Sequence, residues 1–262
     1  MYPRILHIYG PLWINSYGVM IALGVLVFAV LTLHNPIRKK IIDPATFFDS
    51  LFIGLLGGIV GGRLLYVLES YSAFMQNPIE IFYLWDGGFS LLGSIITILL
   101  TLPFYLKSKK VPVLPFLDLI TIYVPLLQSI SRIGCFLAGC CYGMQTCDNF
   151  IFAVHYKCPQ CLAPLNTPLH PTQLYSSFAS FMIFIILQFW ASKKAKFSGQ
   201  ILFTYLFLEG FARFFVDFWR GDRNIILFNF ISFAQIIAIF ICIFAVFAII
   251  YLRLIKKSGK NC

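Results

Sequence analysis

The sequence has few charged residues and very few acidic ones. Only 11% of its 262 residues are charged, with 10 Asp and Glu against 20 Lys and Arg, and 60% are hydrophobic. The mean hydropathy is +0.85. Ordinary soluble domains carry about 25% charged residues. The shortage of charge therefore excludes such a domain and predicts a chain that mainly crosses a bilayer.

Long apolar runs dominate the sequence. A transmembrane helix needs roughly 20 apolar residues, and seven segments come close to that length. They are residues 13–33, 47–68, 88–106, 112–133, 171–190, 199–219 and 228–252. We predict an all-α membrane protein, a seven-transmembrane-helix bundle forming a single domain over residues 1–262. The first segment is too long for a signal-peptide core and lacks an A-x-A-type cleavage site, so it counts as a helix.

The basic residues predict the orientation of this bundle. Thirteen of the 20 Lys and Arg follow odd-numbered segments. Cytoplasmic loops carry an excess of Lys and Arg, so the N-terminus is predicted outside and the C-terminus in the cytosol. The net charge of +10 then reflects membrane topology, and we expect no nucleic-acid partner.

Six of the seven remaining basic residues are arginines, and four of these lie within or directly after hydrophobic segments. Arg63, Arg132, Arg213 and Arg220 all fall in the predicted outer halves of their helices. A cation in a span costs about 2.5–3.5 kcal/mol on insertion scales, so it usually has a partner or a function. Ion pairs that pin helices together are one interpretation. We favour an anion site open to the outer leaflet, because a planar guanidinium suits bidentate contact with phosphate.

Two motifs describe the faces of individual helices. The stretch GLLGGIVGGR, residues 54–63, repeats glycine every four residues, which predicts close packing against another helix. Glu209, Arg213 and Asp217 follow one another at four-residue spacing, with Arg220 three residues later. That spacing predicts one charged helix face turned toward the bundle interior or a wet cavity.

Six of the eight cysteines lie within residues 135–161, which the predicted topology places outside the cell, where disulfides are permitted. We predict an extracytoplasmic cysteine-rich loop over about residues 135–170. Six cysteines allow 15 connectivities. The CPQC stretch, Cys158–Cys161, also has zinc or redox spacing. We rank structural disulfides first, a metal site second and redox catalysis third, and we assign no metal and no cofactor.

Several motifs together resemble the bacterial prolipoprotein diacylglyceryl transferases, over nearly the whole chain. SRIGCFLAGCCYG at residues 131–143 resembles the family signature G-R-x-G-N-F-x-N-G-E-x-x-G, and HPTQLYSS resembles H-P-[ST]-Q-L-Y-E. GPLWINSYGVM, GGRLLYVL and RFFVDFWR resemble the opening, second-helix and late arginine motifs of the family. Among the matching positions are Tyr17, Arg63, Arg132, Gly134, Gly143, His170, Gln173, Tyr175, Arg213 and, as a carboxylate, Asp217.

The departures from the family pattern fall mainly on polar positions. Cys135 and Ala138 replace two asparagines, and Cys140 replaces the glutamate of the signature. Further departures are Ser131 for glycine, Leu92 for histidine, Ser94 for glycine, Ser176 for glutamate and Glu209 for tyrosine. Positions suited to phosphate binding are therefore kept, while positions suited to proton transfer differ.

The resemblance implies transfer of diacylglyceryl from phosphatidylglycerol to the lipobox cysteine thiol of a prolipoprotein, in the bacterial cytoplasmic membrane and toward its outer leaflet. The implied partners are phosphatidylglycerol, prelipoprotein signal peptides and membrane lipids. We expect Arg132, Arg213 and His170 to be catalytic. We expect the substrate-binding residues to be Arg132, Tyr17, Gly143, Arg63, Asp217 and Gln173. His170 and Asp217 remain the candidate bases.

Three other functions compete with this one. The first is a catalytically inactive phospholipid-binding relative, and the second is a membrane thiol oxidoreductase that uses the cysteines. The third is a small-anion transporter, because Pro112, Pro115 and Pro125 predict a broken fourth helix. No internal repeat is visible, which weighs against transport.

Overall fold

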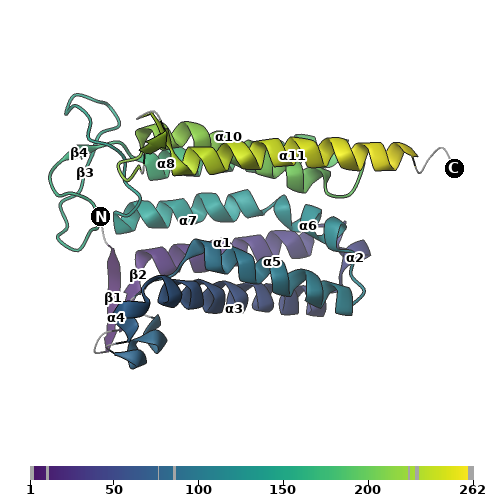
Figure 1. Ribbon diagram of the computed structural model, residues 1–262, viewed down its shortest axis with the longest axis horizontal. Coiled ribbons are helices and arrows are strands. Elements are labelled where there is room, and N and C mark those ends of the chain that lie inside the picture. The colour runs from purple at the N-terminus through teal and green to yellow at the C-terminus, as the bar shows by residue number, and fades with distance from the viewer. Residues whose placement is uncertain are drawn as a thin grey trace. The chain divides into compact units, whose positions relative to one another are not determined.

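The computed structural model describes residues 3–9, 12–75, 77–84, 87–223, 225–227 and 230–258. The chain forms two compact units, one of Met1–His34 with Leu117–Cys262 and one of Asn35–Phe116. Figure 1 labels the elements of both. The single domain over residues 1–262 stays a prediction.

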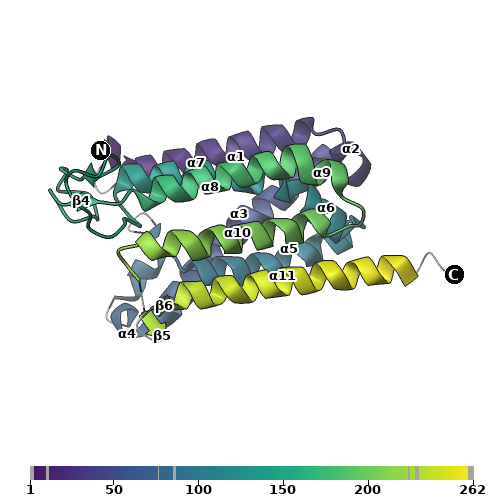
Figure 2. The same ribbon diagram turned by 90° about the horizontal axis from the view of Figure 1, so that it is seen from above.

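The first unit is a row of packed helices. Its members are α1 (Ser16–His34), most of α6 (Val113–Thr121), α7 (Val124–Ala138), α8 (Thr172–Ile186), α9 (Ser192–Lys194), α10 (Gln200–Val216) and α11 (Phe233–Ser258). A π-helical turn at Leu187–Ala191 joins α8 to α9, and a 3₁₀ turn at Asp217–Trp219 follows α10. Helix α7 packs between α1 and α8, α8 packs on α10, and α10 packs on α11 (Figure 2).

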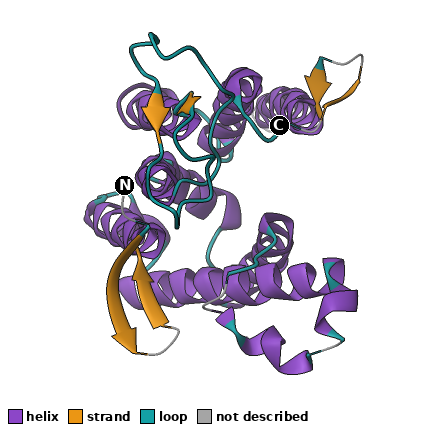
Figure 3. Ribbon diagram, turned by 90° about the vertical axis from the view of Figure 1, so that its left-hand side faces the viewer, coloured by secondary structure: helices purple, strands orange, loops and turns teal. Residues whose placement is uncertain are grey.

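Three short antiparallel strand pairs also belong to this unit, so the chain is mostly helical rather than all-α. They are β1 (Arg4–Tyr9) with β2 (Leu12–Asn15), β3 (Val154–His155) with β4 (Pro168–Leu169), and β5 (Ile225–Leu227) with β6 (Ile231–Ser232) (Figure 3). Figures 1 and 2 place all three at one end of the unit, where α7 ends and α8 and α11 begin.

The second unit is built on a close pair of helices. It contains α2 (Arg38–Ile41), α3 (Pro44–Glu69), α4 (Tyr71–Phe74), the 3₁₀ helix η1 (Pro78–Phe82) and α5 (Leu91–Ser108). Asp43 caps α3 by accepting a hydrogen bond from the Thr46 amide at 2.9 Å, and Pro44 opens the helix. The body of α3 packs along α5.

Glycines allow α3 and α5 to come this close, as the four-residue spacing predicts. A Cβ on Gly61 would collide with Thr97 and lie 2.6 Å from the carbonyl oxygen of Gly93. A Cβ on Gly54, two turns earlier in α3, would meet nothing within 4 Å. The predicted close packing is confirmed, and it is confined to part of the glycine repeat.

Hydropathy and length identify several spans in the described part of the chain. Four helical stretches are long and apolar enough to cross a membrane, namely Ser16–His34, Pro44–Glu69, Thr172–Lys194 and Phe233–Lys257. Helices α6 and α7 make a fifth if the pair counts as one, and α5 is a shorter apolar helix. Each of the seven predicted segments contains a helix, but seven spans stay a prediction.

The predicted break in the fourth segment is confirmed. Helices α6 and α7 are bent by 46° relative to each other, and the break lies at Ile122 and Tyr123. Pro125 lies in the first turn of α7, where its missing N–H removes no helical hydrogen bond.

Helices α6 and α10 share one polar anchor. The Asp118 carboxylate on α6 accepts hydrogen bonds from the backbone amides of Gly199 at 2.6 Å and Leu202 at 2.9 Å, at the start of α10. Asp118 is buried, and its oxygens satisfy amides that the helix itself leaves free. The N-terminus of α10 is thereby tied to the broken helix.

We predict that Gly61→Ala destabilises the protein, because the new methyl group overpacks the contact with α5. Overpacking of this kind costs about 1–3 kcal/mol in unfolding free energy. Gly54→Ala is the matched control and should be neutral or slightly stabilising, since alanine is the better helix former. Thermal unfolding of both variants in detergent checks this, and equal effects of the two substitutions would contradict it.

Candidate functional site

Helices α7, α8 and α10 enclose a small polar pocket, called here the arginine pocket. It is lined by Gln128, Arg132, Ser176, Ala179, Ser180, Glu209, Ala212, Arg213 and Val216. On α7 the residues 128, 132 and 135 share one face, and on α10 the residues 209, 213 and 216 do. These spacings turn Arg132 and Arg213 toward the same space from different helices.

Arg132 and Arg213 are the two cations of this pocket, and both are half-buried. Neither forms a hydrogen bond or ion pair with any residue that the structure describes. They act electrostatically on each other, and Arg220 acts on Arg213 as well. The pocket therefore carries positive charge with free N–H donors.

Glu209 supplies the carboxylate of the pocket. One of its oxygens accepts a hydrogen bond from the Gln128 amide, and that amide's own oxygen accepts one from the Tyr205 hydroxyl at 3.0 Å. The other oxygen, Oε2, is buried and has no hydrogen-bond partner among the described residues. Glu209 therefore keeps one oxygen available beside the two arginines.

The other two arginines near the end of α10 are paired. Arg220 donates two hydrogen bonds to Asp222, at 2.7 and 2.6 Å, and this contact holds the pKa of Asp222 below its usual range. Arg223 lies 3.5 Å from the Asp217 carboxylate and donates to the Phe230 carbonyl. The charges of Arg220 and Arg223 are therefore largely neutralised by carboxylates of the protein.

Asp217 follows Arg213 by one helical turn, and its backbone amide donates to the Arg213 carbonyl, as the predicted four-residue spacing requires. The residue begins the 3₁₀ turn after α10, where the helical period changes. Its carboxylate is buried and accepts a hydrogen bond from the Ser232 hydroxyl. Asp217 is absent from the pocket lining, and its substrate-binding role stays a prediction.

Arg63, also predicted to bind substrate, has its guanidinium fully engaged inside the second unit. It is buried, and its N–H groups donate to five backbone carbonyls, those of Glu80, Ile81, Tyr83, Gly87 and Gly88. A guanidinium has five N–H donors. Arg63 therefore ties α3 to residues 80–83 and 87–88 through all five of its donors, and its substrate-binding role stays a prediction.

His170 and Gly143 pack together at the entrance to α8. The Gly143 amide donates to the His170 carbonyl at 3.0 Å, and a Cβ on Gly143 would lie 2.6 Å from the His170 Cβ. The centroid of the His170 ring lies 4.8 Å from that of Phe150 with the rings tilted by 57°, and the His170 ring contacts the Tyr175 hydroxyl at 3.2 Å. Neither residue lines the arginine pocket, so the structure does not bring His170 together with Arg132 and Arg213.

The turn after α7 has the geometry of a Schellman cap. Gly139 has a φ of 73°, its amide donates to the Phe136 carbonyl, and the Cys140 amide donates to the Cys135 carbonyl at 3.1 Å. This cap commonly brings the side chains of its first and last residues together, and here those residues are Cys135 and Cys140. Their neighbour Cys141 also has a positive φ, of 56°.

Gln173, predicted to bind substrate, instead holds this turn in place. It is buried, and its Nε2 donates to the Cys140 carbonyl at 2.7 Å and contacts the Tyr156 hydroxyl at 3.1 Å. Thr172 donates to the Cys141 carbonyl at 2.9 Å. Burial raises the pKa of Tyr156 to about 12, so this hydroxyl stays protonated at neutral pH.

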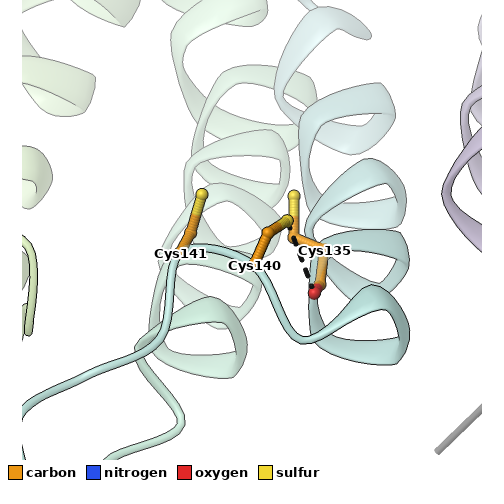
Figure 4. A group of neighbouring side chains, drawn as sticks. All are labelled: Cys135, Cys140 and Cys141. Atoms are coloured by element: carbon orange, nitrogen blue, oxygen red, sulfur yellow. Dashed lines mark hydrogen bonds between the residues drawn. The ribbon is translucent and has the colours of Figure 1, made fainter. Parts of the chain in front are cut away.

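The turn gathers three thiols into what we call the three-cysteine cluster, Cys135, Cys140 and Cys141 (Figure 4). Their sulfur atoms all lie within 4.8 Å of one another. Hydrogen bonding to the thiols of Cys135 and Cys140 lowers the pKa of the Cys141 thiol, and Arg220 and Arg132 add to this effect. All described cysteines have free thiols, so the structure does not contain the disulfides that we ranked first.

Comparison with known proteins assigns the chain to a family. The model of the prolipoprotein diacylglyceryl transferase family matches residues 3–251. The chain belongs to this family. It is 39% identical over 249 residues to the phosphatidylglycerol–prolipoprotein diacylglyceryl transferase of Clostridium tetani, covering 94% of this chain and 96% of the relative.

Other relatives of the same description agree. The transferase numbered 2 of Clostridium perfringens is 35% identical over 232 residues, covering 88% of each chain. A transferase of Acinetobacter baumannii is 30% identical over 242 residues, covering 90% of this chain and 87% of the relative. The resemblance stated from the motifs is confirmed, and the protein is a multi-pass membrane protein.

Several of the residues that depart from the family pattern lie in or near the arginine pocket. Cys135 and Cys140, which depart from the signature, are two of the three clustered cysteines. Glu209, which stands at a tyrosine position, faces both arginines. Sequence reasoning placed Glu209 on a charged helix face and missed its contact with Gln128. The sequence did contain a signal for this site: Gln128 and Arg132 on α7, and Glu209 and Arg213 on α10, are each four residues apart and so share one helix face.

We predict that Arg63→Lys destabilises the protein, because a lysine has three donors and cannot satisfy five carbonyls. Buried groups left unsatisfied cost about 1–3 kcal/mol each. A lower unfolding temperature in detergent, with KM for phospholipid unchanged in the folded fraction, is the expected result. Unchanged stability with a raised KM would instead assign Arg63 to the substrate.

Proposed function

We propose that the arginine pocket binds the phosphate of phosphatidylglycerol while the diacylglyceryl group passes to the lipobox cysteine of a prolipoprotein. Membership of the transferase family supports the reaction. The observation that supports the site is the charge of Arg132 and Arg213, which outnumber the single carboxylate of the pocket and form no ion pair with any described residue. An apolar bundle that keeps two such cations is suited to an anionic ligand.

The chemistry requires charge stabilisation at the leaving phosphate. The thiolate sulfur forms a bond to the glycerol carbon as the bond from that carbon to the phosphate oxygen breaks, and glycerol-1-phosphate leaves with both electrons. Negative charge therefore grows on the phosphate. Arg132 and Arg213 have free N–H groups that can donate hydrogen bonds to this phosphate. Donors that are in position before the reaction give the most effective electrostatic catalysis.

The acceptor thiol must lose its proton, because the thiolate is the nucleophile. We assign the proton-accepting role to Glu209 in preference to His170 and Asp217. Its free oxygen lines the same pocket as both arginines, whereas His170 and Asp217 do not line it. The nearby guanidinium groups also favour the thiolate.

Tyr17 and Gly143 are proposed to shape the head-group side of the site. Tyr17 begins α1 beside Gly134, and a Cβ on that glycine would lie 3.2 Å from its Cα. Tyr17 also interacts electrostatically with Arg132. The residue as a whole is 42% exposed.

The proposed setting is the bacterial cytoplasmic membrane, crossed seven times, with the N-terminus outside and the C-terminus in the cytosol. Within the first unit, the end that carries the strand pairs and residues 139–171 would face outward. The opposite end carries α9 and the last turns of α11, whose lysines suit the cytoplasmic side (Figure 2). The site then opens toward the outer leaflet.

Arg132→Ala and Arg213→Ala are each expected to lower kcat/KM by about 10²–10³-fold, as loss of one preorganised donor does elsewhere. The assay measures transfer of labelled diacylglyceryl from phosphatidylglycerol to a lipobox peptide in membranes that contain the protein. Lys157→Ala, an exposed cation in residues 139–171, is the matched control and should keep parental activity. Activity that survives both arginine substitutions would reject the pocket as the phosphate site.

Glu209→Gln is expected to lower kcat by about 10²–10⁴-fold with little change in KM, because it removes a proton acceptor while keeping shape. Raising the pH should partly restore the rate, since more of the acceptor thiol is then ionised without help. His170→Gln measured in parallel separates the two candidates. A larger loss with His170→Gln, and the pH rescue confined to it, would move the role to that residue.

A further inference from the structure

The three-cysteine cluster is not needed for the transfer chemistry proposed above, and its geometry suits another task. The three sulfur atoms lie within 4.8 Å of one another. A tetrahedral Zn²⁺ with Zn–S bonds of about 2.3 Å holds its thiolates about 3.8 Å apart. Small side-chain rotations therefore suffice to bring all three sulfurs to one ion.

The backbone around the cluster is already fixed. The Schellman cap sets Cys140 over Cys135, and the buried side chains of Thr172 and Gln173 hold the carbonyls of Cys141 and Cys140. Cys141 has a left-handed backbone conformation, which is uncommon for a residue with a side chain. Its sulfur points in the same direction as those of Cys135 and Cys140 (Figure 4). A ligand set that is oriented before binding loses little freedom on binding.

The surrounding charge is compatible with thiolates. Metal ligation requires deprotonated cysteines, and three thiolates around a divalent ion leave one net negative charge. Arg132 and Arg220 both act electrostatically on the Cys141 sulfur. Arg132 stands one turn before Cys135 on the same face of α7, so its positive charge lies near the cluster.

We propose that Cys135, Cys140 and Cys141 form a binding site for a thiophilic divalent cation, with Zn²⁺ as the natural ion. Three protein thiolates leave the fourth position of the ion to water or another small ligand. The bound ion would clamp the last turn of α7 to the segment that leads to Gly143. This site replaces our sequence-based assignment of no metal.

A disulfide fits the same observations less well. It would join two of the three sulfurs and leave the third as an unpaired thiol within 4.8 Å of them. The vicinal pair Cys140 and Cys141 is a poor candidate, because a disulfide needs a specific separation and dihedral angle that neighbouring residues rarely reach. A metal ion uses all three thiols at once.

The test uses the purified full-length protein in detergent, freed of metal by a chelator and kept in a non-thiol reductant. Co²⁺ serves as the probe, because thiolate ligation produces charge-transfer absorption. We expect one Co²⁺ per chain, displaced by Zn²⁺. Cys135→Ser, Cys140→Ser and Cys141→Ser should each weaken binding more than about tenfold, since outer-shell changes alone cost 10–100-fold at metal sites.

The double variant Cys158→Ser with Cys161→Ser is the matched control, because it removes the CPQC pair from the same segment. It should bind Co²⁺ as the parent does. Absence of thiolate absorption in the parent, or loss of binding in the control alone, would overturn the proposal. So would a disulfide between any two of the three cysteines in protein isolated without reductant.

A measurement on the parent protein alone removes any dependence on folding of the variants. Thiol alkylation mapped by mass spectrometry should show Cys135, Cys140 and Cys141 protected when Zn²⁺ is present and reactive when it is removed. Cys147, Cys158 and Cys161 should react equally in both samples. Equal reactivity of all six with and without Zn²⁺ would also overturn the proposal.

Discussion

The central physical constraint in the first unit is a pair of arginines, Arg132 and Arg213, that share a pocket with one carboxylate and form no ion pair with any described residue. Placing Arg132 and Arg213 in an apolar helix bundle is unfavourable until an anion arrives. The remaining polar groups around them are largely satisfied: Arg220 has Asp222, Arg223 has Asp217, and Gln128 links Glu209 to Tyr205. An anionic ligand that enters the pocket therefore meets free donors without breaking existing pairs.

The number of N–H donors that are already hydrogen-bonded also explains why the arginines of this chain differ in role although they look alike in sequence. Arg63 is buried, and its five N–H donors bind five backbone carbonyls. Its contribution is to the shape of residues 80–83 and 87–88. A guanidinium with free donors and one whose donors are all bonded thus differ in their neighbours. For Arg63 those neighbours are backbone carbonyls.

Sequence reasoning succeeded where one helix or one local rule decides the outcome. Hydropathy located the helices, the prolines predicted the break before α7, and glycine spacing predicted the contact between α3 and α5. It failed where partners come from distant segments. The contact of Asp217 with Ser232 and that of Gln173 with the Cys140 carbonyl depend on tertiary packing that no local spacing encodes.

The shared anchor at Asp118 has a consequence for chain length. Arg132 follows Asp118 by 14 residues, and Arg213 follows Gly199, whose amide Asp118 binds, by 14 residues as well. The positions of both arginines are thus set by their distance along the chain from the Asp118–Gly199 contact, one through α6 and α7 and the other through α10. One inserted residue in either path would shift its arginine by about 1.5 Å and rotate it by about 100°. The number of residues between anchor and pocket is therefore more tightly constrained than the identity of most residues in between.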